Sequence, residues 1–200
     1  EANRRAAFPE SMIYLQISRG TAKRHRGIPA GCTPTVVITV RPLEDSSKLR
    51  EAGIRVVTVP DQRWARCDIK SVALLANVLA YQAAKQAGVN DAVFVEPDGS
   101  VNESTAGNLF IVAGAELATP PTGPRLLAGV TRDKIVQLTG ASERRITKGA
   151  LLDADEVFLT STTAEVVPVV SVDGKSIGAG QPGPRSREVY RQFVAKYAGG

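Results

Sequence analysis

The stretch Asp61–Ser71, DQRWARCDIKS, lies between two segments that predict different secondary structure. Ahead of it, the β-branched run in Gly53–Pro60 predicts a strand. Behind it, apolar residues recur at i, i+3 and i+4 from Leu75 onward, which predicts a helix. A loop between a strand and a helix can present side chains to a ligand, so both the predicted fold and the predicted site are organised around this stretch.

Strands and helices are interspersed along the rest of the chain. Further strands are predicted at Met12–Ile17, Pro34–Val40, Ala92–Val95, Asn108–Val112 and Glu156–Thr160, and a hairpin over Val166–Ile177 that closes at Asp173-Gly174. Helices are predicted at Thr131–Leu138 and Ser186–Tyr197. Because the order lacks a strict strand–helix–strand rhythm, an α+β fold is favoured over a doubly wound α/β fold.

The composition is that of a water-soluble globular protein. Of the 200 residues, 43% are hydrophobic and 22% are charged, and no apolar run is long enough to cross a bilayer. Cys32 and Cys67 are far apart, and there is one histidine, so a metal site built from Cys and His is not expected. Two cysteines suit a reducing compartment, and we expect a cytoplasmic protein.

The formal net charge is +5, which raises the question of a nucleic-acid partner. The basic residues are spread along the chain, with local clusters at Lys23–Arg26, Arg63–Arg66 and Arg144-Arg145. Aromatic residues make up only 5% of the chain, which disfavours a surface that stacks bases. We therefore expect an anionic small ligand, or an incidental surplus of arginine, and no nucleic acid.

Lys70 has two interpretations. A solvated surface lysine is the common fate of this residue type. Alternatively, burial and the neighbouring cations Arg63 and Arg66 could keep its amine partly neutral, as a nucleophilic lysine requires. The spacing alone does not choose between them.

Four other polar segments are open to both structural and functional interpretations. Glu103, within NESTAGN at 102–108, lies in a turn-like segment but could pair with a buried cationic nitrogen. Gly129 precedes a helix start that could bind an anion, and Thr131 could equally be a helix cap. The hydroxyl run Thr160–Thr163 could bind phosphate or close its own loop. The basic loop Ser18–Gly27 could bind a carboxylate or be solvated.

Taken together, these segments resemble the class IV (fold-type IV) aminotransferases, which include D-amino acid aminotransferase, branched-chain aminotransferase and aminodeoxychorismate lyase. The resemblance is closest to the D-amino acid enzymes and runs across nearly the whole chain. It is carried by IYLQISRGTA at 13–22, RWARCDIKS at 63–71, LLAGVTRD at 126–133 and DEVFLTSTTAEVVPV at 155–169.

The resemblance implies that the chain binds pyridoxal 5′-phosphate (PLP). In that case Lys70 holds the cofactor as a Schiff base and moves the substrate proton, and Glu103 pairs with the pyridine nitrogen. Arg63 would lie near the phenolic oxygen of the cofactor. The residues that would hold the ring and the phosphate are Leu127, Gly129, Val130, Thr131, Ser161, Thr162 and Thr163.

The resemblance also implies a substrate side and a partner. Tyr14, Arg24, His25 and Arg26 match positions near the substrate. The D-amino acid enzymes carry Arg-x-His in this loop, whereas Arg24-His25-Arg26 places an arginine where that histidine would stand. Two cations remain, so a trap for the substrate carboxylate is still expected. In this family the loop reaches the partner's active site, which implies a homodimer.

Family members carry several dozen residues ahead of the position of Ile13, and these form most of a small α/β domain. We therefore expect residues 1–41 to be the C-terminal remnant of that domain and 42–200 to be the large cofactor-binding domain. The expected reaction is transfer of an amino group between a D-amino acid, such as D-alanine, and a 2-oxo acid. The alternatives are branched-chain L-amino acid transamination, aminodeoxychorismate lyase chemistry, and a non-catalytic PLP-binding protein.

Overall fold

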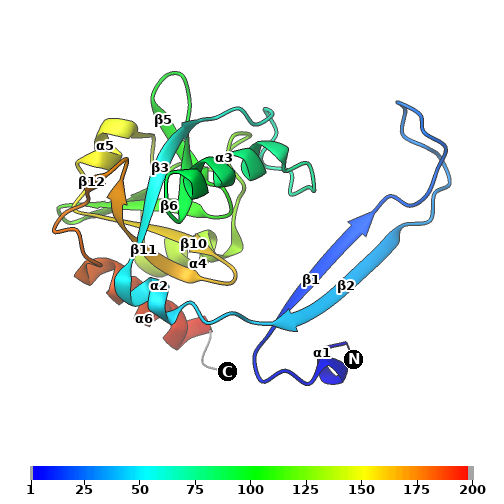
Figure 1. Cartoon of the computed structure of the whole chain (residues 1–200), viewed down its shortest axis with the longest axis horizontal. Coiled ribbons are helices and arrows are strands. Elements are labelled where there is room, and N and C mark those ends of the chain that lie inside the picture. Colours follow the sequence, from blue (N-terminus) through cyan, green and yellow to red (C-terminus); the bar gives the residue numbers. More distant parts are fainter. Residues whose placement is uncertain (1, 198–200) are drawn as a thin grey trace. The chain divides into compact units, whose positions relative to one another are not determined.

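The computed structural model of the chain describes residues 2–197, which fall into two compact units divided between Asp45 and Ser46 (Figure 1). The expected domain boundary lay a few residues earlier, after residue 41. The interpretation of the first unit as the remnant of a small domain stays a prediction.

The first unit is a β-ribbon with one short helix. Its elements are α1 (Ala2–Ala6), β1 (Ser11–Ser18) and β2 (Thr35–Pro42). The two strands pair antiparallel, from Ser11 opposite Pro42 to Ser18 opposite Thr35. Both strands were predicted from their β-branched and aromatic residues. Residues 19–34 join them without a helix or strand.

The second unit is built on a ten-stranded sheet with five helices around it. Its strands are β3 (Ile54–Pro60), β4 (Asp91–Val95), β5 (Ser100–Ser104), β6 (Asn108–Ala113), β7 (Glu116–Thr119), β8 (Ser142–Glu143), β9 (Ile146–Thr147), β10 (Glu156–Ser161), β11 (Glu165–Val172) and β12 (Lys175–Ser176). Its helices are α2 (Ser47–Ala52), α3 (Leu75–Gln86), α4 (Val130–Thr139), α5 (Lys148–Leu152) and α6 (Pro184–Tyr197).

The sheet closes on itself. The strand order runs β6–β10–β11–β3–β4–β5, and β5 also pairs with β6 where Glu103 lies opposite Asn108. The pairs β11–β3 and β3–β4 are parallel, while the other pairs in this ring are antiparallel. This mixed barrel with helices outside it confirms the predicted α+β class.

Side chains alternate between the two faces of the barrel strands, as the period of two requires. In β6, Leu109 and Ile111 join the cluster that also holds Val157 of β10, and Phe110 faces the other way. Phe110 is in register with Phe158, and their rings stack at a centroid distance of 4.9 Å. The aromatic pair belongs to the cluster that packs against α4 and α6, so these helices cover the outside of β6 and β10.

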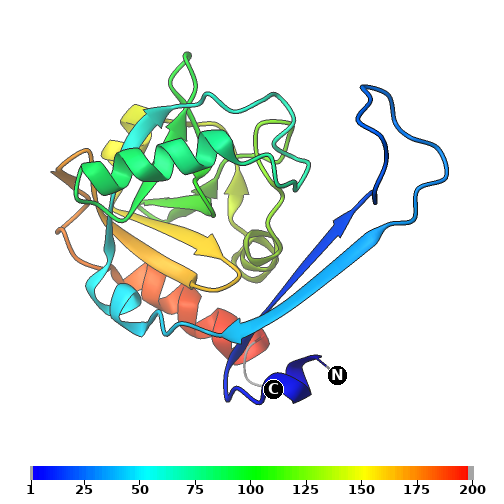
Figure 2. The ribbon, with the colours of Figure 1, turned by 45° about the vertical axis from the view of Figure 1, so that its right-hand side comes forward.

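Helix α3 lies against β3 and β4, but not by the face that the sequence suggested (Figure 2). The apolar stripe that predicted the helix stays exposed: Leu75 is 72% exposed and Leu79 is 60% exposed. The buried face carries Ala80 and Ala84, which pack on Phe94. Small side chains let the helix axis approach the sheet closely, so the periodicity identified the helix correctly but not its buried side.

Several short elements were not predicted, among them β5, β7, β8 and α5. Each has at most five residues, which is too few to show a clear period. Segment 102–108 was interpreted as a turn before a strand, whereas residues 100–104 form β5 and place Glu103 on a strand. Among residues 2–197, no helix combines the length and apolar character needed to span a bilayer.

Candidate functional site

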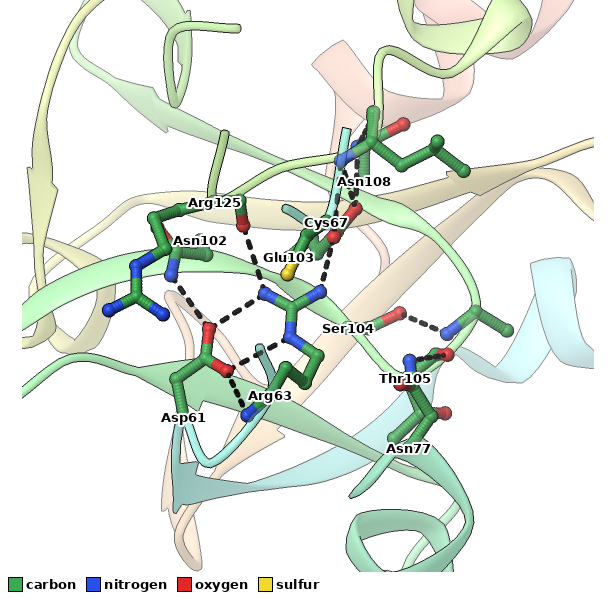
Figure 3. Close-up of polar contacts among 12 residues, drawn as sticks. Asp61, Arg63, Cys67, Asn77, Asn102, Glu103, Ser104, Thr105, Asn108 and Arg125 are labelled. Carbon is green, nitrogen blue, oxygen red and sulfur yellow. Dashed lines mark hydrogen bonds and ion pairs between the residues drawn. The ribbon is translucent and has the colours of Figure 1, made fainter. Parts of the chain in front are cut away.

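Arg63 lies between two buried carboxylates, Asp61 and Glu103 (Figure 3). Its Nε and Nη2 donate to the two oxygens of Asp61 at 2.9 and 2.7 Å, and its Nη1 donates to Oε1 of Glu103. Its guanidinium also lies 4.2 Å from the centre of the Phe94 ring. Loop 61–74, which joins β3 to α3, is thereby tied to β5 of the barrel.

These three side chains are almost fully removed from solvent, with 6% of Arg63, none of Asp61 and 7% of Glu103 exposed. Burial acts to raise the pKa of Asp61, but hydrogen bonds from Arg63 and Asn102 outweigh it and hold that pKa below its ordinary value. Burial likewise raises the pKa of Glu103, and here the single contact with Arg63 does not reverse the effect. Asp61 therefore holds its charge more firmly than Glu103 does.

Glu103 has further donors at the seam where the barrel closes. The backbone N–H of Leu127 donates to its two oxygens at 3.2 and 3.3 Å, and Nδ2 of Asn108 donates to Oε2 at 3.1 Å. Asn108 also donates to the carbonyl of Leu127 at 2.9 Å. The predicted residues Glu103, Arg63 and Leu127 are thus brought together by direct hydrogen bonds.

Gly129 packs tightly against this group. A Cβ built on Gly129 would lie 2.1 Å from Oδ1 of Asn108, which is a clash. Asn108 has no freedom to move away without losing its bonds to Glu103 and Leu127. The close approach of the backbone therefore explains the glycine, without any unusual φ angle.

The start of α4 meets the turn between β10 and β11. Gly129 is the N-cap of α4, so Thr131 lies in the first turn and is not the cap. The hydroxyl of Thr131 donates to the carbonyl of Ser161 at 3.2 Å. The two segments that were expected to hold a phosphate are therefore adjacent, and the free N–H groups of a helix start favour an anion there.

Ser161, in the hydroxyl run of that turn, has the structural one of the two roles considered for the run. The Ser161 hydroxyl accepts the N–H of Ala164 at 3.2 Å and so closes the loop on itself. Thr162 and Thr163 are exposed, and neither hydroxyl has a hydrogen bond within residues 2–197. Val130 is also open to solvent, with 73% of its surface exposed.

Lys70 lies in loop 61–74 and is exposed. In the described part of the chain its amine has no hydrogen bond or ion pair. Of the two interpretations open from the sequence, the described chain shows the exposed lysine and not the buried one. Arg63 is taken up by its two carboxylates, and Arg66 pairs with Asp68 at 2.8 Å on the surface.

The predicted substrate-side residues belong to the first unit. Tyr14 lies on β1 and donates its hydroxyl to Gln16 at 2.9 Å. Arg24, His25 and Arg26 line an open hollow of about 570 Å³ in the loop between β1 and β2. Nδ1 of His25 accepts the N–H of Gly27 at 2.9 Å, which shapes the loop locally.

Asp61, Asn102 and Asn108 were not identified from the sequence. Nδ2 of Asn102 donates to Asp61 at 2.8 Å and to Glu96 at 2.9 Å, and thus extends the hydrogen-bond network to the residue that follows β4. The only signal in the sequence was an Asp two residues before an Arg. A single polar residue in a loop does not show from sequence that it is buried. Asn108 could be identified only after its pairing with Glu103 was known.

A second groove, of about 810 Å³, lies between α2, β11 and α6. Its lining includes Arg50, Arg187 and Tyr190 but none of the predicted site residues described above. Its volume therefore does not mark the site around Glu103.

Comparison with known proteins gives a family match and several relatives. A family model described as amino-transferase class IV matches residues 1–172. A D-alanine aminotransferase of Bacillus licheniformis is 42% identical over 182 residues, which are 88% of this chain and 64% of that protein. A D-alanine aminotransferase of Staphylococcus haemolyticus is 35% identical over 191 residues, covering 90% of this chain and 66% of that protein. The chain thus spans just under two thirds of these relatives.

Solved structures agree with the sequence comparison. The branched-chain amino acid aminotransferase of Escherichia coli has a TM-score of 0.84 and 28% identity, covering 97% of this chain and 67% of that one. A second branched-chain amino acid aminotransferase, from T.th. and complexed with N-(5′-phosphopyridoxyl)-L-glutamate, has a TM-score of 0.85 and 26% identity, covering 98% and 67% of the two chains. The predicted fold type IV is confirmed.

Replacement of Gly129 by alanine tests the packing at the seam. Because the new Cβ would clash with Asn108, we expect Gly129→Ala to lower the free energy of unfolding by about 1–3 kcal/mol, as overpacking of a filled site does. Gly123→Ala is the matched control, since its Cβ meets nothing within 4 Å. Urea unfolding of both variants measures the difference, and equal stabilities would contradict the packing described here.

The raised pKa of Glu103 predicts a pH dependence of stability. Between the ordinary value of 4.5 and its raised value, the folded state binds more protons at this group than the unfolded state, so stability falls as pH rises. Glu103→Gln cannot titrate at this position. As pH rises through that window, the difference in free energy of unfolding between the variant and the unmodified protein should therefore shift in favour of the variant.

The exposed Glu116 is the control, because hydrogen bonds from Arg144 and Ser142 lower its pKa to about 2. Its contribution to stability is present above pH 4.5 and is lost only as pH falls below that value. Urea unfolding from about pH 4.5 to 8 should therefore show a pH-independent difference for Glu116→Gln. A constant difference for Glu103→Gln would rule out the raised pKa.

Proposed function

We propose that this chain, which belongs to the class IV aminotransferase family, binds pyridoxal 5′-phosphate and transfers an amino group from a D-amino acid such as D-alanine to a 2-oxo acid. The D-amino acid assignment is supported by the two D-alanine aminotransferases that the chain resembles along most of its length. The observation that carries the cofactor assignment is the buried carboxylate of Glu103, which lies at the barrel seam close to the start of α4.

The residues at the seam fit the two ends of this cofactor. Glu103 is a buried acceptor for the ring N–H, since two of its three donor groups, Leu127 and Asn108, are uncharged. When bound, PLP supplies an electron sink for the charge that develops on the substrate α-carbon. Leu127, whose N–H holds Glu103, is suited to pack against the ring.

The start of α4 and the β10–β11 turn are suited to hold the phosphate. We assign its donors to the N–H groups of Val130 and Thr131 and to the exposed hydroxyls of Thr162 and Thr163. Ser161 supports them, because its carbonyl accepts the Thr131 hydroxyl. Fixing the phosphate would fix the orientation of the ring.

Lys70 is the lysine that we assign to the cofactor carbonyl. Its exposed amine lies three residues after buried Cys67, in the same loop that delivers Arg63 to Glu103. In this role the amine would hold the cofactor through its carbonyl carbon, with water as the leaving group, and, once released, would be the base that accepts the proton of the substrate α-carbon. From the sequence, Arg63 was expected near the phenolic oxygen of the cofactor. Its hydrogen bond to Glu103 also supports a role in holding the carboxylate that would face the ring nitrogen.

The substrate side of the proposal uses the first unit. Arg24 and Arg26 are suited to bind the substrate carboxylate, with His25 shaping their loop and Tyr14 on the adjoining strand. We further propose a cytoplasmic homodimer in which this loop serves the partner's site. The unpaired thiols of Cys32 and Cys67 are compatible with a reducing compartment.

Branched-chain L-amino acid transamination is the second candidate, because the two solved structures compared above carry that activity in their names. Aminodeoxychorismate lyase chemistry would use the same cofactor site. A non-catalytic PLP-binding protein is the least supported, since Lys70, Glu103 and Thr131 are all present.

Loss of the Lys70 amine tests the cofactor assignment. We expect Lys70→Ala in the purified protein to lose the visible absorbance of bound PLP and to lower transamination by at least about 10²-fold, because both covalent attachment and the base are removed. Lys85→Ala on α3 is the control and should behave like the unmodified protein. Retention of an absorbance band that borohydride abolishes would show that another lysine is used.

A substrate panel tests the reaction. We expect D-alanine with 2-oxoglutarate to be turned over faster than L-leucine or L-isoleucine with the same acceptor, measured as release of pyruvate and of the branched-chain 2-oxo acids. Turnover of the L-amino acids without turnover of D-alanine would reverse the order of the two candidates. Release of pyruvate from aminodeoxychorismate would point to the lyase.

A further inference from the structure

The charges buried around Arg63 do not cancel. When both carboxyls are ionised, Asp61 and Glu103 carry two negative charges against the single positive charge of Arg63. The next pair outward, Glu96 and Arg125, is neutral in itself, with Oε1 and Nε 3.2 Å apart. The inner group is therefore one counter-charge short.

Asp61 takes the larger share of the guanidinium. It accepts from Nε, from Nη2 and from the backbone N–H of Arg63, the last at 3.1 Å. Glu103 receives only Nη1. Its remaining donors, Leu127 and Asn108, are neutral. Glu103 is therefore the carboxylate whose negative charge is not fully balanced.

Asp61 is held in this arrangement from its other side. Nδ2 of Asn102 donates to Oδ2 of Asp61, and no part of the Asp61 side chain is exposed. A carboxylate fixed in this way cannot turn away from Arg63 to release a donor for Glu103.

We infer that Asp61 is a positioning residue for the cofactor: by occupying two of the three nitrogens of the Arg63 guanidinium, it leaves Glu103 to pair with a protonated ring nitrogen. The inference rests on the proposed function, in which Glu103 faces that nitrogen. Without the charge of Asp61, Arg63 and Glu103 would form a self-contained neutral pair with a weaker preference for a cation. The charge of the ring nitrogen is thus set by a residue that does not touch it.

Within the described chain, the charged and titratable groups around the Arg63–Glu103 pair come from three segments. They are Asp61, Arg63 and Cys67 of loop 61–74, Glu96 after β4, and Arg125 before α4. Burial raises the pKa of the Cys67 thiol, so it stays neutral at neutral pH. Asp61 is therefore the ionised carboxylate that acts most directly on the Arg63–Glu103 pair.

The test begins with the protein free of cofactor. The pKa of Glu103 is measured by ¹³C NMR of labelled glutamate carboxyls, which Glu103→Gln assigns. Asp61→Asn should lower this pKa, because it removes a neighbouring negative charge and frees donors of Arg63. Asp68→Asn removes a carboxylate from the same loop that is paired with Arg66 at the surface, and it should leave the pKa unchanged. An unchanged pKa in Asp61→Asn would overturn the inference.

The unmodified protein keeps the inference testable if Asp61→Asn does not fold. Labelled aspartate carboxyls then report Asp61 directly. The inference requires Asp61 to remain ionised at the pH where Glu103 gains its proton. Protonation of Asp61 before Glu103, as pH is lowered, would overturn it.

The loaded protein supplies a second measurement. The ¹⁵N chemical shift of the ring nitrogen of labelled PLP should report a protonated nitrogen in the unmodified protein and a smaller protonated fraction in Asp61→Asn, with recovery in Asp61→Glu. An equal protonated fraction in Asp61→Asn would contradict the inference. Failure of the unmodified protein to bind PLP would instead refute the proposed function, while the cofactor-free titration would still decide whether Asp61 acts on Glu103.

Discussion

Arg63, held between the buried carboxylates of Asp61 and Glu103, is the interaction on which the site depends. It joins loop 61–74, which carries Lys70, to β5 of the barrel. An arginine in such a place is stable only while its partners remain, since breaking a buried ion pair typically costs about 3–5 kcal/mol. The loop is thus fixed by charge more than by apolar contacts, because its own apolar residues Trp64 and Ile69 are 53% and 44% exposed.

The closing of the barrel places the remaining groups. The sheet becomes a ring where Glu103 lies opposite Asn108, and Asn108 also holds the Leu127 carbonyl and packs against Gly129. One seam therefore positions an acidic acceptor and the start of α4. The Thr131–Ser161 hydrogen bond then adds the β10–β11 turn. A buried carboxylate with a raised pKa is a destabilising feature, and such features are typical of sites where function constrains the fold.

Much of this arrangement could be predicted from sequence, and the failures have physical causes. Long strands such as β1, β3 and β11 were predicted because their runs of β-branched and aromatic residues extend over enough positions, and β11 also because the turn Asp173-Gly174 follows it. The exposed stripe of α3 shows that an apolar period indicates a helix without indicating what covers it. Family resemblance selected Lys70 and Glu103 from many polar residues. It did not select Asp61, because the importance of Asp61 lies in sharing the Arg63 guanidinium with Glu103. Arg63 and Glu103 are 40 residues apart in sequence, so only the folded chain reveals that they meet.

We propose that one site combines the acid Glu103, the N–H groups at the start of α4 and the amine of Lys70. The most direct test is to load the purified protein with PLP, reduce it with borohydride and locate the added phosphopyridoxyl mass by peptide mapping. We expect the mass to lie on Lys70, in the peptide that contains residues 67–70. A label on Lys85, Lys148 or another lysine, or no stoichiometric label at all, would contradict it.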